Sequence, residues 1–392
     1  MSGPLAGVKI IEVAGLGGAP YGCMMLADMG AEVIRVDRLG GDKDTPATSP
    51  LLRSRRSIAL DLKRPSGRDV LLAMVSSADV LIEAFRPGVA ERLGIGPEPC
   101  IARNPRLVYG RLTGWGQTGP LASMAGHDLN YISLSGILHQ IGPSGGPPVV
   151  PLNVIGDFGG GGLLLAYGIA CALFESRQSG RGQIVDAAML DGALSFMAMF
   201  FGYKAAGQFS DRTGEHLLGG GAHYYNVYET QDHKSLAVAP IEPQFYGPFL
   251  QRLGLTEERW PNAGYPALDN STIEREWPAL KDLLARIFRT RSRDDWCAVF
   301  HGSDVCVTPV LSLQEAADHP HNRARQSIID VGGVVQNAPA PRFSRTSTVA
   351  PQPPRKAGAD TGRILEEWRI DGDLISRARA EGALDPLAAM PS

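Results

Sequence analysis

The sequence has few charged residues and no long apolar run. Charged side chains make up 20% of the 392 residues, the formal net charge is -3, and neither end carries a basic or acidic tail. A protein that binds nucleic acid through a broad positive field is therefore not expected. The most apolar stretch, 161–174, is shorter than the roughly 20 residues of a membrane-spanning helix and is rich in glycine. We expect it to be a buried core helix, and we expect no membrane partner.

Cysteine is scarce, and its positions show no paired spacing. The five cysteines are Cys23, Cys100, Cys171, Cys297 and Cys306. This pattern favours reduced thiols over a disulfide framework or a zinc site, so no metal is expected. The N-terminal residues lack the charged and apolar regions of a signal peptide, and the C-terminal AAMPS matches no organelle address. These absences predict a cytoplasmic protein.

The sequence is rich in hydrophobic residues, at 44%, and its length predicts two domains with a large core. Short β-branched runs alternate with helical patterns over the first part of the chain. This alternation is typical of a parallel α/β sheet, here a Rossmann-like one, whose ligand lies across the loops at the strand ends. The expected strands are 8–13, 31–36, 57–62, 80–84 and 107–113.

The middle of the chain predicts a second, smaller α+β domain. A long apolar helix, 189–207, with core-facing methionine and phenylalanine side chains, precedes it, and a glycine cluster, 219–221, follows that helix. Strands are expected at 224–230 and 236–239, and helices at 271–289 and 293–300. The predicted division is a large α/β domain 1–188, a linker 189–223, a small α+β domain 224–330, and a segment 331–392 that returns to the large domain.

A glycine turn after the first strand invites comparison with a dinucleotide site. Gly15, Gly17 and Gly18 precede a helix, and the next strand ends at Asp37, at the right spacing for a ribose contact. However, Pro20 occupies the position where close packing of helix on strand requires glycine, and proline instead starts a helix. A tight turn opening a helix explains these glycines, and a nicotinamide site is disfavoured.

Basic residues follow several expected strands. Any one of them is explained by a solvated surface, but several at one sheet edge would suit a ligand with multiple phosphates. They are Arg38, Arg53, Arg55, Arg56, Lys63, Arg64, Arg86 and Arg92.

Three titratable side chains have both a structural and a chemical interpretation. His127 lies where a helix starts at Asp128, and a lone histidine there is more often a cap than a catalyst. Asp157 precedes glycines 159–162 and reads as an N-cap, yet four glycines cost a helix about 1 kcal/mol each against alanine. Something therefore requires bare backbone nearby. Glu242 precedes Pro243 after a strand and reads as a surface acid.

Ordered sequence blocks over nearly the whole chain resemble the family III CoA transferases, and in particular their racemase branch. The blocks include GLGGAPYGCMMLADMGAEVIRVDR, EAFRPGVAERLGIGP, LTGWGQTGP, AGHDLNYISLSG, PLNVIGDFGGGG, GRGQIVDAAMLDG and PIEPQFY. Transferases of this family use an aspartate at the position of Asp128, whereas the racemases place a histidine just before it, as His127 stands here. The resemblance therefore implies proton transfer next to a CoA thioester.

The resemblance also implies roles for particular residues. His127 and Asp157 would be the two bases, and Glu242 would orient His127. No cofactor is implied, because coenzyme A is part of the acyl-CoA substrate, and the family fold is an interlocked homodimer. The residues implied to hold coenzyme A are Arg38, Ala59, Leu60, Asp61, Leu62, Lys63, Arg86, Arg92, Ala125, Gly126, Asp128, Leu129 and Asn130.

Two alternatives remain open from the sequence. Asp128 could form an acyl anhydride in CoA transfer to a carboxylate, or the chain could bind coenzyme A or a nucleotide without chemistry. The sequence also departs from the racemase pattern at Gly219 and His223, where those enzymes carry aspartate and proline. Both positions are implied to lie along the path of the acyl chain.

Overall fold

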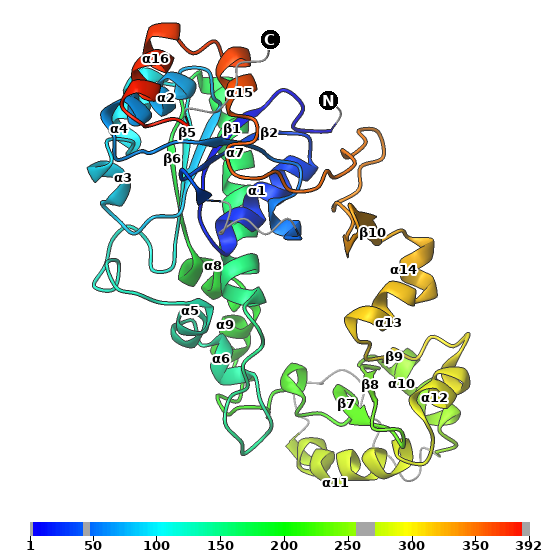
Figure 1. Ribbon diagram of the computed structural model, residues 1–392. Helices are drawn as coiled ribbons and strands as arrows, with labels where there is room; N and C mark the ends of the chain where they lie inside the picture. The colour runs from blue at the N-terminus through cyan, green and yellow to red at the C-terminus, as the bar shows by residue number, and fades with distance from the viewer. Residues whose placement is uncertain (1–2, 42–47, 256–270, 386–392) are drawn as a thin grey trace. The chain divides into compact units, whose positions relative to one another are not determined.

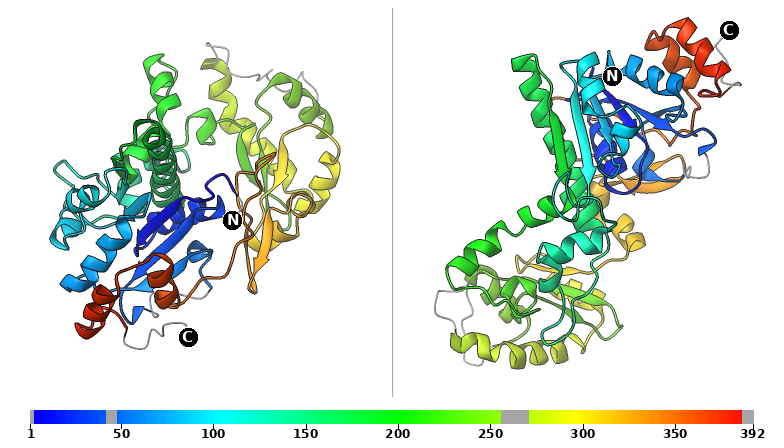
Figure 2. Two further views of the ribbon diagram at one scale, coloured as in Figure 1. Left: turned by 90° about the horizontal axis from the view of Figure 1, so that it is seen from above. Right: turned by 90° about the vertical axis from the view of Figure 1, so that its left-hand side faces the viewer.

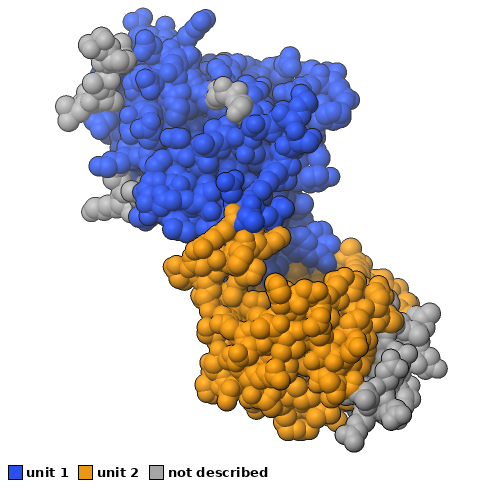
Figure 3. Space-filling model, turned by 90° about the vertical axis from the view of Figure 1, so that its right-hand side faces the viewer, with its two compact units in different colours: residues 1–135, 152–196, 324–392 blue, residues 136–151, 197–323 orange. Residues whose placement is uncertain are grey.

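The computed structural model describes residues 3–41, 48–255 and 271–385, so the C-terminal AAMPS lies outside the described residues. The chain forms two compact units (Figure 3). Unit 1 comprises Met1–Ser135, Leu152–Phe196 and Ala324–Ser392, and unit 2 comprises Gly136–Pro151 and Met197–Arg323. Each unit therefore draws on separated parts of the chain, whereas the sequence placed its boundaries at 188, 223 and 330.

Unit 1 contains a six-stranded parallel sheet of order β3-β2-β1-β4-β5-β6 (Figure 1). The expected parallel α/β class is confirmed, and all five expected strands are present. The sixth, β6, was missed because its sequence IVDAA alternates weakly and its first residue is half exposed. The strands are β1 Lys9–Val13, β2 Glu32–Asp37, β3 Arg56–Ala59, β4 Val80–Glu83, β5 Val108–Thr113 and β6 Ile184–Ala188.

Helices cover both faces of this sheet. Successive side chains of a strand point to opposite faces, and here both sets include buried apolar residues. Ile10 packs with the core formed by α1 and α7, and Ile11 with the core formed by α2, α15 and α16. In the right-hand view of Figure 2 the blue and cyan strands lie between green α7 and red α16. The helices of unit 1 are α1 Gly18–Asp28, η2 Pro50–Leu52, α2 Pro65–Val75, α3 Val89–Arg92, α4 Pro97–Arg103, α5 Asp128–Leu134, η3 Val154–Leu163, α7 Leu164–Ser179, α8 Met189–Ser195, α15 Thr361–Glu367 and α16 Gly372–Ala380.

The glycine-rich segment forms a π-helix, η3, that packs tightly between α1 and α8. A Cβ on Gly162 would lie 2.2 Å from the carbonyl oxygen of Gly18, and one on Gly160 would lie 2.7 Å from the backbone nitrogen of Ala193. These close approaches of backbone to backbone are the reason for the glycines. π-Helical turns are frequent at functional sites.

Two helix expectations need correction. The stretch 161–174 is split between η3 and α7, and it is not fully buried, because Tyr167 and Phe174 are exposed. The expected helix 189–207 is two helices, since α8 ends at Ser195 and α9, Ala198–Ala205, begins three residues later. No residue of α9 is buried within the chain, so its methionine and phenylalanine side chains do not enter the core.

Unit 2 combines a three-stranded antiparallel sheet with helices, as the predicted α+β pattern requires. Its core is aromatic, with Tyr224, Tyr246, Phe249, Phe288 and Trp296 packed together. Its elements are α6 Ile137–Gln140, α9, η4 Leu217–Gly219, β7 Asn226–Glu229, β8 Ser235–Val238, α10 Pro243–Arg252, α11 Ser271–Phe288, α12 Arg293–Phe300, β9 Val307–Pro309, α13 Leu313–Asp318 and α14 Pro320–Ala324; a hairpin of β10, Ile328–Val331, and β11, Val334–Asn337, follows it along the chain.

Candidate active site

A pocket of about 220 Å³ lies at the carboxyl ends of the strands of unit 1. It is formed by loops that follow β1, β4 and β5, together with the start of α8 after β6. In the observed strand order the direction of winding reverses between β1 and β4, which is where open α/β sheets bind ligands. Four residues implied for the site line this pocket: Arg86, Ala125, Gly126 and His127.

His127 and Asp128 form the start of α5 beside this pocket. His127 is the N-cap residue and is exposed, and its backbone N–H donates to Oδ1 of Asn130 over 3.0 Å. The first N–H groups of a helix have no carbonyl partner within it. Among the described residues, the backbone N–H groups of Asp128 and Leu129 have no acceptor. Two donors are thus free next to the histidine.

The carboxylate of Asp128 is not free to act as an acid or a nucleophile. It is buried, and its Oδ1 accepts hydrogen bonds from the backbone nitrogens of Gly156 at 2.6 Å and Asp157 at 2.8 Å. Burial raises the pKa of the Asp128 carboxyl above its ordinary value, while those two donors oppose the shift. The turn that carries His127 is therefore attached to the segment that carries Asp157.

Asp157 lies on η3, against the N-terminus of α1. Its Oδ2 accepts a hydrogen bond from Nδ2 of Asn153 over 3.0 Å, and a Cβ on Gly17 would lie 3.5 Å from the same oxygen. Gly17 has a φ of 71°, so the glycine turn is the expected tight turn that opens a helix. Asn153 was not predicted from the sequence; its spacing of four residues before Asp157 on a helical segment is the signal that could have found it.

Tyr131 lines the pocket and was likewise not predicted as a site residue from the sequence. It lies one turn after Asp128, and its hydroxyl donates to the carbonyl oxygen of Gly126, which fixes the turn before His127. Its ring packs edge-on against Trp115 with centroids 4.8 Å apart. A Cβ on Gly114 would lie 2.1 Å from this ring, which explains the glycine there.

The structure separates the basic residues by their partners, and Arg56 and Arg64 form ion pairs with Glu32 and Asp61 without being fully buried. Arg53 and Arg55 are fully buried in ion pairs with Asp28 and Glu12, so they support the fold. In contrast, the four cations implied for the CoA site are all exposed, and none of them forms an ion pair within the described residues: Arg38, Lys63, Arg86 and Arg92.

Only part of the implied CoA set lies at this pocket. Arg38 and Lys63 follow β2 and β3, on the other half of the sheet, and they do not line it. Ala59 and Leu60 are buried at the end of β3, and their backbone N–H groups donate to Oγ1 of Thr361 and to the carbonyl oxygen of Asp37. The remaining implied residues are partly or fully exposed: Asp61 and Leu62 follow β3, and Leu129 and Asn130 belong to the first turn of α5.

Glu242 belongs to unit 2. It is the N-cap residue of α10, is half-buried, and is followed by Pro243 at the first helical position. The structure describes each unit by itself, so the pairing of Glu242 with His127 stays a prediction.

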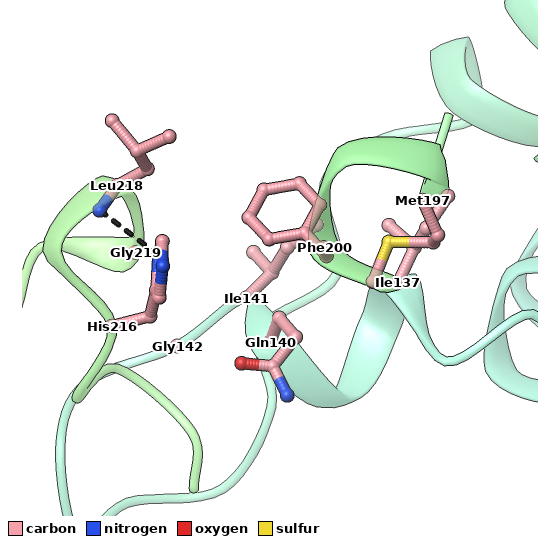
Figure 4. A pocket seen from close by; sticks show the side chains of 9 residues that line it. All are labelled: Ile137, Gln140, Ile141, Gly142, Met197, Phe200, His216, Leu218 and Gly219. Atoms are coloured by element: carbon pink, nitrogen blue, oxygen red, sulfur yellow. Dashed lines mark hydrogen bonds between the residues drawn. The ribbon is translucent and has the colours of Figure 1, made fainter. Parts of the chain in front are cut away.

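The two departures from the racemase pattern have different surroundings. Gly219 lines an apolar pocket of about 300 Å³ in unit 2, together with Ile141, Phe200 and Leu218 (Figure 4). His223, in contrast, is buried in the aromatic core, where its Nε2 lies 2.8 Å from the hydroxyl of Tyr246. His223 is therefore not exposed at the surface of unit 2, and its place along the path of an acyl chain stays a prediction.

Among the described residues, no group of three or more His, Cys, Asp and Glu side chains is arranged to hold a metal ion. The expectation of a metal-free and cofactor-free reaction stays a prediction.

Comparison with known proteins identifies the family. Residues 5–361 match the sequence model of CoA-transferase family III. The chain is 44% identical to the α-methylacyl-CoA racemase of Mus musculus, with 96% of each chain covered, and 40% identical to that of Homo sapiens, with 97% covered. A crystal structure of a CAIB/BAIF family protein from Brucella suis is similar with a TM-score of 0.81 at 27% identity, covering 94% of this chain and 100% of that one. The chain belongs to CoA-transferase family III.

Proposed function

We propose that this protein is an isomerase that interconverts (2R)- and (2S)-2-methylacyl-CoA thioesters by moving one proton at the α-carbon. The observation that carries the proposal is the placement of His127 in the strand-end pocket, beside the N–H of Asp128, which has no acceptor in the described part of the chain. Membership of the family and the names of the two racemase relatives support it.

The α-proton of a thioester is weakly acidic, so its removal requires a base and stabilisation of the enolate oxygen. A general base supplies about 10²- to 10⁴-fold, and each oxyanion donor about 10²- to 10³-fold. His127 is the proposed base for the S epimer. The N–H of Asp128 is the proposed donor to the thioester oxygen, since that N–H has no acceptor among the described residues.

Inversion requires a second group that delivers a proton to the opposite face. We assign this to Asp157, which Asn153 and Asp128 hold beside the same turn. In the reverse reaction Asp157 removes the proton and His127 returns one. Glu242 is proposed to orient His127, and the exposed Arg86 is proposed to meet the phosphates of coenzyme A. We propose that the reaction needs no metal or further cofactor. We also propose that the protein is cytoplasmic.

We also propose an interlocked homodimer. In unit 1, one face of the η3 and α7 helix exposes apolar side chains at helical spacing, Leu163, Tyr167 and Phe174. In unit 2, α9 separately exposes Met199 and Phe201. Apolar exposure on this scale marks an interface. The helix 154–179 is also long and apolar enough to cross a membrane by length and composition, but a second copy covers it in this proposal. Light scattering should then give twice the chain mass of 41.8 kDa.

The alternative of CoA transfer through Asp128 is disfavoured by geometry. The carboxylate is buried, and one of its oxygens already accepts two backbone hydrogen bonds. The other oxygen, Oδ2, has no hydrogen-bond partner among the described residues but is itself buried, so neither oxygen is open to an acyl group in this arrangement.

Incubation of a 2-methylacyl-CoA in deuterated water, with no acceptor acid present, tests the function. We expect one deuterium at the α-carbon and an approach to a near-equal mixture of epimers. His127→Ala should abolish inversion. A requirement for an acceptor acid with the α-carbon still protonated would establish the transferase instead, and binding without exchange would leave only a CoA-binding protein.

A further inference from the structure

We propose that the carboxylate of Asp128 is a positioning residue for Asp157, acting through the two backbone hydrogen bonds that attach the start of η3 to the His127 turn. The inference rests on the racemase function proposed above and adds a residue to that reaction. It gives the side chain of Asp128 a role distinct from that of its backbone N–H.

The contact uses donors that the helix itself cannot satisfy. The N–H groups of Gly156 and Asp157 lie in the first turn of η3, where no carbonyl of the same helix is available. Oδ1 of Asp128 accepts both, at 2.6 and 2.8 Å, although Asp128 lies 28 residues before Gly156 and 29 residues before Asp157 in the chain. The carboxylate thereby serves as the cap of a helix on another segment.

The hydrogen bond from Asp157 to Asp128 fixes the backbone nitrogen of Asp157, the residue proposed to deliver the proton. The N–H that Asp128 holds belongs to Asp157 itself, while the carbonyl oxygen of Asp157 is confined by Gly18, where a Cβ would lie only 2.4 Å away. The backbone of Asp157 is thus held on both sides. A misplacement of about 1 Å at a reacting group can lower a rate by about 10²-fold.

Asp128 also connects the two proposed bases, His127 and Asp157. His127 precedes Asp128 directly, and Asp157 is bound to its side chain. The other carboxylate oxygen, Oδ2, is buried and has no hydrogen-bond partner among the described residues. The function of the side chain therefore depends on Oδ1 as an acceptor, which an amide oxygen can replace and a methyl group cannot.

The test compares Asp128→Ala with Asp128→Asn for each epimer separately in deuterated water. In Asp128→Ala, Asp157 is displaced, so the exchange of the R epimer and inversion in both directions should fall about 10²-fold. The S epimer should still exchange with retention, because exposed His127 can remove its proton, take up deuterium from solvent and return it to the same face. Asp128→Asn should lose less than tenfold in every rate.

Two further variants serve as controls. Asp157→Asn should reproduce the pattern of Asp128→Ala, with S exchange kept and R exchange lost. Asp371 is a comparable cap, because its Oδ1 accepts hydrogen bonds from the backbone N–H groups of Asp373 and Leu374, at 3.0 Å each, at the start of α16. Asp371→Ala should leave the ratio of S to R exchange unchanged.

Three outcomes would overturn the inference while wild-type exchange is normal: equal losses for both epimers in Asp128→Ala, no loss in Asp128→Ala, or an Asp128→Asn variant as impaired as the alanine variant. Absence of exchange in the wild type would instead refute the proposed function.

Discussion

A methyl group on Gly192 of α8 would lie 1.9 Å from the carbonyl oxygen of Gly160 on η3. The two helices therefore touch backbone to backbone, and this contact holds the segment that carries Asp157 against the sheet. Neither residue can gain a side chain without moving one helix.

Gly192→Ala should lower the free energy of unfolding by about 1–3 kcal/mol and reduce turnover, because overpacking displaces η3. Gly247→Ala is the matched control: Gly247 lies inside α10, and a Cβ there meets nothing within 4 Å. That variant should be neutral or gain up to about 1 kcal/mol. Urea unfolding and epimerisation rates measure both, and equal stability of the two variants would contradict the contact.

Arg86→Ala should raise KM at least tenfold and change kcat little, because a charge-assisted hydrogen bond to a phosphate contributes about 1.5–3 kcal/mol to binding. Arg86 lines the pocket, is exposed, and has no ion pair among the described residues. Arg103→Ala, at the exposed end of α4, is the control and should keep both constants. An unchanged KM for Arg86→Ala would remove Arg86 from the site.

Glu242→Gln should lower turnover by about 10²-fold while CoA affinity is kept, because the amide cannot stabilise a charged imidazole. The measurement is kcat together with a dissociation constant for free coenzyme A. Glu381→Gln, an exposed acid after α16, should match the wild type in both. Wild-type turnover in Glu242→Gln would return Glu242 to the role of a helix N-cap.

Arg53→Ala should destabilise the protein by about 3–5 kcal/mol, because it leaves the carboxylate of Asp28 buried and unpaired. Arg53 donates to both oxygens of Asp28 and also to Gln336 and the carbonyl oxygen of Asn337, so it ties the C-terminal segment to the sheet unit. Arg323→Ala breaks an exposed pair with Asp318 and should cost no more than about 0.5 kcal/mol. Denaturant midpoints compare the two, and similar losses would refute the argument.

His223 should make unit 2 less stable in acid. Burial, and to a smaller extent the charge of Lys281, lower the pKa of His223 from 6.5 to about 3. Between these values the unfolded chain binds the proton and the folded chain does not, so the free energy of unfolding falls as pH drops below 6.5, by up to about 1.4 kcal/mol per pH unit.

Replacing His223 with Gln should flatten that dependence between pH 6.5 and 4, since glutamine can still bond Tyr246 but does not titrate. His301→Gln removes an exposed histidine and should leave the curve as in the wild type. Urea unfolding followed by tryptophan fluorescence at several pH values gives the slopes. An unchanged slope in the His223 variant would show that another group is responsible.

Periodicity and residue order in the sequence determined the class of fold and the family. Five of the six parallel strands follow from short β-branched runs between helical patterns, and ordered blocks from GLGGAPYG to PIEPQFY carry the family resemblance. The sequence also placed His127 at the start of a helix and Asp157 beside its glycines. Strands, helix starts and glycine-rich segments depend on residues that are neighbours in the chain, so local sequence patterns are enough to predict them.

Only the tertiary structure decided which partner each side chain meets. Arg53 and Arg86 look alike in sequence, yet one is buried against Asp28 and the other lines a pocket. The glycines after Asp157 are explained by α1 and α8, which are far from them along the chain. The apolar pattern of α9 predicted burial in the core, but within the described residues no residue of that helix is buried. A sequence pattern shows that one face of a helix or strand is apolar or charged. Which segment packs against that face depends on contacts between residues far apart in the chain, and the periodicity of the sequence does not reveal those contacts.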